Sequence, residues 1–129
     1  MSLFKFEGNI PASKSLFNRA LILQSFFPQM KIQGASTCDD VKAMQSALQN
    51  FKEKKDIYCG EAGTVLRFMA LRVSREPGTW KLTGSKRLME RPHDELTYLL
   101  EQLGVHADVF KDHILIQSKG WQEPLVPVV

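Results

Sequence analysis

The sequence predicts an α/β fold made of short, alternating strands and helices. Three observations point to this class. The chain has 129 residues, of which 43% are hydrophobic and 24% charged, as in an ordinary globular protein. Hydrophobic residues alternate with period two in some segments and follow the helical period in others. Glycine or proline punctuates most of these segments. The predicted order is β-α-β-α, then β-α-β-α-β-β, a repeat of element order rather than of residue identity.

The first predicted unit covers residues 1–55. Residues 4–6 alternate as a short strand, and residues 13–27 predict a helix that Pro28 ends. Residues 30–32 alternate again as a second strand. The apolar side of the helix is expected to hold Leu16, Ala20, Leu23 and Phe27, with Phe17 and Leu21 beside them.

A second helix is expected to follow Ser36 or Thr37, because either hydroxyl can cap a helix. Asp39 and Asp40 suit its first turn, where the helix dipole favours negative charge. A charged link then leads to the next strand, so the first unit lacks a closing hairpin. The buried stripe of this helix is predicted to be Val41, Met44, Leu48 and Phe51.

The second predicted unit covers residues 56–118, and an apolar tail covers residues 119–129. An open apolar end of this kind is a candidate for self-association or for cover by more chain. The whole chain is therefore interpreted as a single, partial domain. In order, the unit's elements are a strand at 57–59, a turn at 60–63, a helix at 64–73, a strand at 80–83, a helix from Pro92 to Gly104, and a hairpin of strands at 105–109 and 114–116.

Composition excludes several classes of protein. Cys38 and Cys59 form no Cys-x-x-Cys pair and the three histidines lie far from them, which argues against a zinc site or a disulfide scaffold. No apolar run is long enough to span a membrane, and the first residues do not resemble a secretory signal. A cytoplasmic location is expected. The net charge of +3 suits an anionic ligand but does not demand nucleic acid.

The start of the first helix combines groups that an anion would bring together. Lys14 lies in a first turn, where the helix dipole disfavours a cation. Ser15 and Arg19 are four residues apart and share a face, and Asn18 follows Lys14 by one turn. A phosphate or carboxylate bound there would relieve the conflict. The alternative is a serine cap followed by two solvated cations.

Two later loops also join a strand to a helix. Residues 60–64 place two glycines before a helix, followed by Arg67 one turn later, and the plain alternative is a tight turn capped by Thr64. Residues 84–92 carry Lys86, Arg87 and Arg91, and the plain alternative there is a solvated run of charge. Ligands of open α/β sheets gather where strands end and helices begin, so the three loops support one another.

Together these segments resemble the 5-enolpyruvylshikimate-3-phosphate synthase family. The matches run collinearly through nearly the whole chain. They are Ser-Lys-Ser and Asn-Arg-Ala-Leu within residues 13–21, Asp-Asp-Val at 39–41, Gly-Glu-Ala-Gly-Thr at 60–64 with Arg67 following, Leu-Thr-Gly at 82–84, and Arg-Leu-Met-Glu-Arg-Pro at 87–92. Glu61 and Phe68 depart from the family pattern, which has asparagine and proline there.

The resemblance implies a fold of repeated β-α-β-α-β-β units, with the first unit shortened here and the domain incomplete. It implies a transferase of aromatic biosynthesis that joins phosphoenolpyruvate to shikimate-3-phosphate without a metal or cofactor. By position, Lys14 would be catalytic and touch both substrates. The other implied roles are shikimate-3-phosphate binding by Ser15 and Arg19, phosphoenolpyruvate binding by Gly63, Thr64 and Arg87, and shaping of the site by Asp39 and Arg67.

Family members have a second domain that supplies the acidic proton-transfer residues, so this chain alone is expected to have no turnover. Two other functions remain open. One is a non-catalytic module that binds small anions. The other is a small RNA-binding protein, which is less favoured because Trp80 and the phenylalanines fall mainly on apolar stripes rather than on a stacking surface.

Overall fold

The computed structural model describes residues 14–32 and 38–123, with Lys14 and Ser15 described by their backbone alone. The described residues form a mixed sheet with the strand order β1-β2-β4-β3. The strands are β1 (Ile57–Tyr58), β2 (Gly78–Thr83), β3 (His106–Val109) and β4 (His113–Ser118). The helices are α1 (Lys14–Phe26), α2 (Asp39–Lys52), α3 (Gly63–Ser74), α4 (Lys86–Met89) and α5 (Asp94–Gln102).

The sheet combines one parallel pair with an antiparallel hairpin. β1 pairs with β2 in parallel, with Ile57 opposite Leu82, so α3 serves as the crossover between them. β2 and β3 each pair with β4 in antiparallel fashion. This order of elements, β1-α3-β2-α5-β3-β4 with the short α4 inserted, agrees with the order predicted for residues 56–118.

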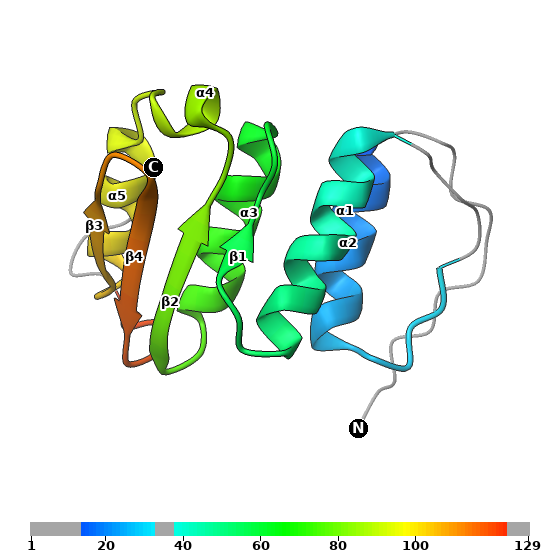
Figure 1. The fold of residues 1–129 in the computed structure, drawn as a ribbon. Coiled ribbons are helices and arrows are strands. Elements are labelled where there is room, and N and C mark those ends of the chain that lie inside the picture. Colours follow the sequence, from blue (N-terminus) through cyan, green and yellow to red (C-terminus); the bar gives the residue numbers. More distant parts are fainter. Residues whose placement is uncertain (1–13, 33–37, 124–129) are drawn as a thin grey trace.

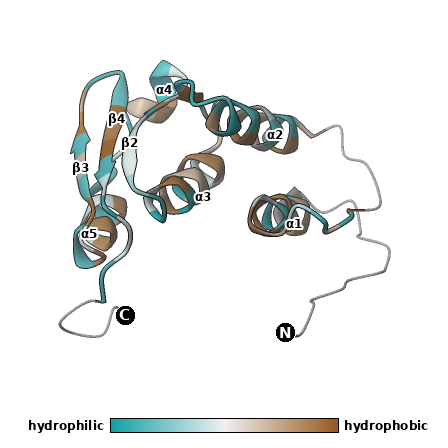
Figure 2. Ribbon diagram, turned by 90° about the horizontal axis from the view of Figure 1, so that it is seen from below, coloured by the Kyte–Doolittle hydropathy of each residue, from teal (hydrophilic) through white to brown (hydrophobic). Residues whose placement is uncertain are grey.

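The larger helices lie on one face of the sheet and beside its β1 edge (Figures 1 and 2). α3 and α5 cover one face, while α2 flanks β1 and α1 packs against α2 and α3. The side chains of β2 and β4 alternate accordingly. Leu82, Ile114 and Ile116 are buried beneath the helices, whereas the residues between them are more exposed. No helix among the described residues is long and apolar enough to cross a membrane.

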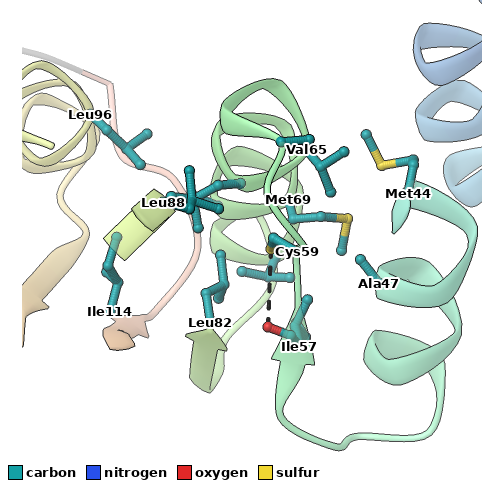
Figure 3. Close-up of a cluster of buried hydrophobic side chains, with 14 of the residues drawn as sticks. Met44, Ala47, Ile57, Cys59, Val65, Met69, Leu82, Leu88, Leu96 and Ile114 are labelled. Atoms are coloured by element: carbon teal, nitrogen blue, oxygen red, sulfur yellow. Dashed lines mark hydrogen bonds between the residues drawn. The ribbon is translucent and has the colours of Figure 1, made fainter. Parts of the chain in front are cut away.

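One continuous core joins all of these layers. Figure 3 shows Met69 reaching from α3 toward Met44 and Ala47 of α2, with Leu82 and Ile114 contributed by the strands. The predicted stripe of α2 is largely confirmed, because Val41 and Met44 are fully buried and Leu48 and Phe51 pack partly buried against the same core.

The buried face of α1 differs from the prediction. Phe17, Ala20 and Leu21 are buried as expected. Leu16, Leu23 and Phe27 are instead about half exposed, at 46%, 46% and 50%. Phe17 and Leu21 belong to the same core cluster as residues of α2 and α3, so their side of α1 faces the core, and of the predicted stripe only Ala20 is buried.

Two further predictions for the first unit are corrected, and one lies outside the described residues. Residues 30–32 form no strand, because the Met30 N–H bonds the Phe27 carbonyl (2.9 Å) and the Gln24 amide bonds the Met30 carbonyl (3.0 Å) in a turn. Cys38, rather than Ser36 or Thr37, occupies the cap position of α2, and its side chain makes no cap hydrogen bond. The strand predicted at 4–6 lies outside the described residues.

The second unit shows smaller differences. The short helix α4, which was not predicted, is capped by Ser85, whose hydroxyl accepts a hydrogen bond from the Leu88 N–H (3.2 Å). α5 begins at Asp94 rather than at Pro92. At the other end, Ser118 donates to the Ser74 carbonyl (2.6 Å), and the Trp121 indole donates to the Ser74 hydroxyl (2.8 Å). Residues 124–129 lie outside the described part, so self-association through the tail stays a prediction.

We expect the Cys59 thiol to resist alkylation in the native protein. Its side chain is fully buried in the core directly after β1, and burial raises the pKa of the thiol to about 12, so almost no reactive thiolate exists near neutral pH. Peptide mapping after iodoacetamide treatment should find Cys59 labelled only when denaturant is present. Rapid labelling of Cys59 under native conditions would show that this part of the core opens readily.

Candidate anion-binding site

One end of the molecule collects the amino ends of several helices. Figure 1 shows β1 and β2 pointing to the same end, where α1, α2 and α3 begin. Helix amino ends carry partial positive charge and unpaired N–H groups. The arrangement agrees with the sequence-based expectation that the strand-to-helix loops lie at a common edge.

Glycine allows the two loops at this edge to pack closely. Gly60 adopts a φ of 65°, which disfavours other residues, and its carbonyl accepts a hydrogen bond from the Ser85 N–H (2.8 Å). A Cβ on Gly84 would lie 3.0 Å from the same Gly60 carbonyl oxygen and 2.7 Å from Leu88. The loop before α3 is therefore fixed against the loop before α4.

Two guanidinium groups meet over Gly63, the first residue of α3. A Cβ on Gly63 would lie 3.0 Å from Arg67 Nη1 and 3.4 Å from Arg91 Nη1. Neither arginine forms a hydrogen bond or an ion pair with another residue of the described ranges. Both arginines are exposed, and their two charges add to the partial positive charge at the amino end of a twelve-residue helix.

A pocket of about 460 Å³ opens beside these arginines. Leu66, Leu88 and Leu96 supply its apolar wall, and Gly63, Arg67 and Arg91 its basic part. The volume falls in the range of small-molecule sites.

The remaining lining residues are Pro92 and three polar residues, His93, Asp94 and Glu95. The two carboxylates lie in the first turn of α5, where they complement the dipole of that helix. His93 Nε2 is shielded from solvent and has no hydrogen-bond partner among the residues that the structure describes. In the described residues, no group of three or more His, Cys, Asp or Glu side chains could hold a metal ion.

The residues predicted to bind phosphoenolpyruvate are only partly brought together. Gly63 lies in the pocket, together with Arg67. Thr64 follows in the first turn of α3, half-buried and outside the pocket lining. Arg87 is exposed on α4 and does not line the pocket, and Glu61 is exposed in the loop before α3.

The residues predicted to bind shikimate-3-phosphate belong to α1. Lys14 and Ser15 are its first two residues, so their backbone lies at the end where the helices begin (Figure 1). Arg19 is exposed and lines a different, apolar groove with Phe26, Arg72 and Trp121. Asp39 is exposed at the first residue of α2.

The sequence-based interpretation assigned no site role to three residues near these side chains, namely Arg91, His93 and Asn18. Arg91 was visible only as one member of a charged run, and His93 as a scattered histidine. Asn18 is 2% exposed, and its amide donates to the Asp40 carbonyl (3.5 Å), which ties α1 to the start of α2. The signal for Asn18 was its position one turn after Lys14.

A small α/β unit with paired, unneutralised arginines at a helix amino end has the features of a domain that binds small anions. Comparison with known proteins gives the family. The family model for EPSP synthase (3-phosphoshikimate 1-carboxyvinyltransferase) matches residues 50–125, and the chain belongs to this family. The resemblance drawn from the sequence motifs is thereby confirmed.

Curated relatives carry the same name. The 3-phosphoshikimate 1-carboxyvinyltransferase of Bacteroides fragilis is 36% identical over 112 residues, which cover 86% of this chain and 27% of the relative. Those of Colwellia psychrerythraea and Shewanella oneidensis are 30% and 29% identical and cover 90% and 82% of this chain. The chain spans 27% to 34% of the length of these relatives. No solved structure matches it.

Proposed function

We propose that this chain provides the amino-terminal half-site of a 3-phosphoshikimate 1-carboxyvinyltransferase. In this proposal, residues 1–55 and 56–118 are two units of one partial domain in the cytoplasm. The observation that carries the proposal is the pair of unneutralised guanidiniums at Gly63, because phosphoenolpyruvate has a phosphate and a carboxylate that such groups attract.

The reaction needs preorganised cations more than it needs a covalent partner. It protonates the methylene carbon of phosphoenolpyruvate, adds the 5-hydroxyl of shikimate-3-phosphate to the neighbouring carbon, and then loses phosphate and a proton to restore the enol double bond. Positive groups fixed in place stabilise the phosphate that leaves. Gly63, Thr64 and Arg87 are the proposed phosphoenolpyruvate contacts, and Arg67 shapes that part of the site.

The second substrate is assigned to the start of α1. Lys14 is proposed to touch both substrates and to act in catalysis, with Ser15 and Arg19 holding shikimate-3-phosphate. Asn18 supports this assignment, because its bond to the Asp40 carbonyl fixes the first turns of α1 against α2. Asp39, the first residue of α2, is proposed to shape the site at the same junction.

Binding without turnover is the expected result for the isolated chain. Titration calorimetry should detect heat with phosphoenolpyruvate, and Arg67→Gln should weaken that binding roughly tenfold or more, because hydrogen bonds to charged groups contribute about 1.5–3 kcal/mol. Arg75→Gln is the matched control, since this guanidinium lies over the rings of Phe26 and Trp121, away from the pocket.

Phosphate release in the presence of both substrates is expected to stay at the uncatalysed rate, because the family's proton-transfer residues belong to a second domain. Release of phosphate by the purified chain would contradict the half-site proposal. So would the absence of heat with phosphoenolpyruvate, or an unchanged affinity in Arg67→Gln.

The non-catalytic anion-binding module differs from this proposal in one measurable respect. It would bind phosphate-bearing ligands in general, with no preference for shikimate-3-phosphate over other sugar phosphates. The RNA-binding alternative is less supported, because Trp80 packs against Phe51 and the core and so offers no open stacking surface.

A further inference from the structure

We infer that Arg72 is a positioning residue for shikimate-3-phosphate, because it fastens the carboxyl end of α1 to α2 and α3. The inference rests on the proposed function for the identity of the ligand. Its starting point is burial. Arg72 is 6% exposed, and among residues 16–32 and 38–123 it is the only buried residue with a charged side chain. A buried guanidinium is costly unless its N–H groups find partners, so the partners of Arg72 indicate what it does.

Arg72 lies in the last turn of α3 and holds the last two residues of α1. Its Nε donates to the Ser25 hydroxyl (2.7 Å), and its Nη2 donates to the Ser25 carbonyl (3.3 Å). The same hydroxyl donates to the Ile22 carbonyl (2.6 Å), which orients its oxygen to accept from Arg72. The guanidinium also lies over the ring of Phe26, 3.9 Å from the centroid. Backbone, hydroxyl and ring at the end of α1 are therefore all in contact with one side chain.

The same guanidinium reaches α2. Its Cζ lies 5.0 Å from the ring centroid of Phe51, in the last turn of that helix, and its Nη1 donates to the exposed Glu76 (3.2 Å). Figure 1 shows α1, α2 and α3 ending on the same side of the molecule. A cation is favourable at helix carboxyl ends. Arg72 thus joins three helices at the end opposite to the candidate site.

Side-chain contacts of this kind are what can set the direction of α1. Residues 30–32 form a turn rather than a strand, so the described chain that follows α1 does not tie it to the sheet. Apolar contacts with α2 and α3 are not directional. Near the other end, the bond from the Asn18 amide to the Asp40 carbonyl is long, at 3.5 Å. The tie at Ser25 is shorter and involves a charge, so we expect it to be the stronger of the two.

The direction of α1 decides where its first residues lie. A helix of 13 residues is about 20 Å long, so a tilt of about 10° moves one end relative to the other by about 3 Å. Displacement of a binding group by about 1 Å is enough to impair a site. Lys14 and Ser15 begin α1, whereas Gly63 belongs to α3, which the parallel pair of β1 and β2 holds in place. Loss of the Arg72 contacts should therefore impair shikimate-3-phosphate binding more than phosphoenolpyruvate binding.

The test compares the full chain with Arg72→Gln, Arg72→Lys and Ser25→Ala by titration calorimetry with each substrate. Arg72→Gln should weaken shikimate-3-phosphate about fivefold or more and phosphoenolpyruvate less than about twofold. Arg72→Lys should recover part of the loss, because lysine keeps the charge but not the planar fork. Ser25→Ala should have a smaller effect in the same direction, since the carbonyl contact remains. A purely structural role would not change the ratio of the two affinities.

Arg75→Gln is the matched control, because it removes an exposed arginine three residues later that donates no hydrogen bond to α1 in the described residues. Amide hydrogen exchange supplies a measurement that needs no ligand. Residues 14–26 should exchange faster in Arg72→Gln than in the parent or in Arg75→Gln. Urea unfolding would check that each variant is folded, and Ser25→Ala carries the comparison if Arg72→Gln does not fold.

The outcomes separate this inference from the proposed function. Equal weakening of both substrates in Arg72→Gln, or equal effects of Arg72→Gln and Arg75→Gln, would overturn the inference alone. Parent-like affinity and exchange in Arg72→Gln would do the same. Absence of shikimate-3-phosphate binding in the parent would overturn the proposed function. Faster exchange of residues 14–26 in Arg72→Gln would then retain Arg72 as the residue that fastens α1, and unchanged exchange would overturn both.

Discussion

Replacing Gly63 with alanine should weaken the binding of phosphoenolpyruvate and inorganic phosphate about tenfold or more. The new Cβ would lie 3.0 Å from Arg67 Nη1 and 3.4 Å from Arg91 Nη1, closer than ordinary van der Waals contact for the first of them. Both contacts are to the far ends of flexible side chains, so the guanidiniums would move apart rather than the backbone. The methyl group would also occupy the space directly above the first turn of α3.

The fold itself should tolerate this change. Gly63 is the first residue of a regular helix and is not among the glycines with positive φ, so alanine causes no backbone strain there and reduces the entropy of the unfolded chain. Urea unfolding should therefore show equal or slightly higher stability, while calorimetry shows the loss of binding.

A double-mutant cycle would tell whether the methyl group acts through the arginines. If it does, adding Gly63→Ala to Arg67→Gln should cost much less than Gly63→Ala alone, because the two changes disturb the same contact. Full additivity would mean that the methyl group acts elsewhere, and unchanged phosphate binding in Gly63→Ala would remove Gly63 from the site.

The second unit was predictable from sequence because its signals are local and agree with one another. Trp80 and Leu82 alternate with Lys81 and Thr83, and Leu96 and Leu100 repeat at the helical spacing. The short helix α4 escaped prediction because four residues are too few to show a period. Its only signal was Ser85, whose capping role depends on a bond visible in the structure.

The first unit was less predictable because its helix is apolar on more than one side. Leu16, Leu23 and Phe27 have the spacing of a buried stripe, as do Phe17 and Leu21. Which side is buried depends on where α2 and α3 lie, and hydrophobic spacing alone does not contain that information. The alternation at 30–32 was too short to distinguish a strand from the turn that the structure shows.

The candidate site likewise combines residues that are close in sequence with one that comes from a distant element. Gly63 and Arg67 lie one turn apart on α3, so their proximity follows from helical spacing. Arg91 reaches the same point from another element, and only the packing of the loop before α4 against Gly60 brings it there. Sequence motifs favoured Arg87, four residues earlier, which is as exposed as Arg91 but does not line the pocket.

Replacing Met69 with alanine should destabilise the protein by about 2–5 kcal/mol. Met69 is fully buried on α3 and reaches toward Met44 and Ala47 of α2 (Figure 3), so it links the helices of the first unit to the sheet of the second. Truncation removes this buried side chain and leaves a cavity between α3 and α2. Because a domain of this size is typically stable by only about 5–15 kcal/mol, the loss would be a large share of the total.

Urea unfolding followed by circular dichroism would measure the effect of Met69→Ala against Tyr98→Ala. Tyr98 lies on α5 and is 62% exposed, so its truncation should change stability by no more than about 0.5 kcal/mol. A lower urea concentration at the midpoint of unfolding, with an unchanged dependence of the unfolding free energy on urea, would mean that both units unfold together. An unchanged midpoint in Met69→Ala, or two separate transitions, would mean that α1 and α2 do not share a cooperative core with the sheet. The substrate groups assigned to α1 would then lack a fixed position relative to Gly63.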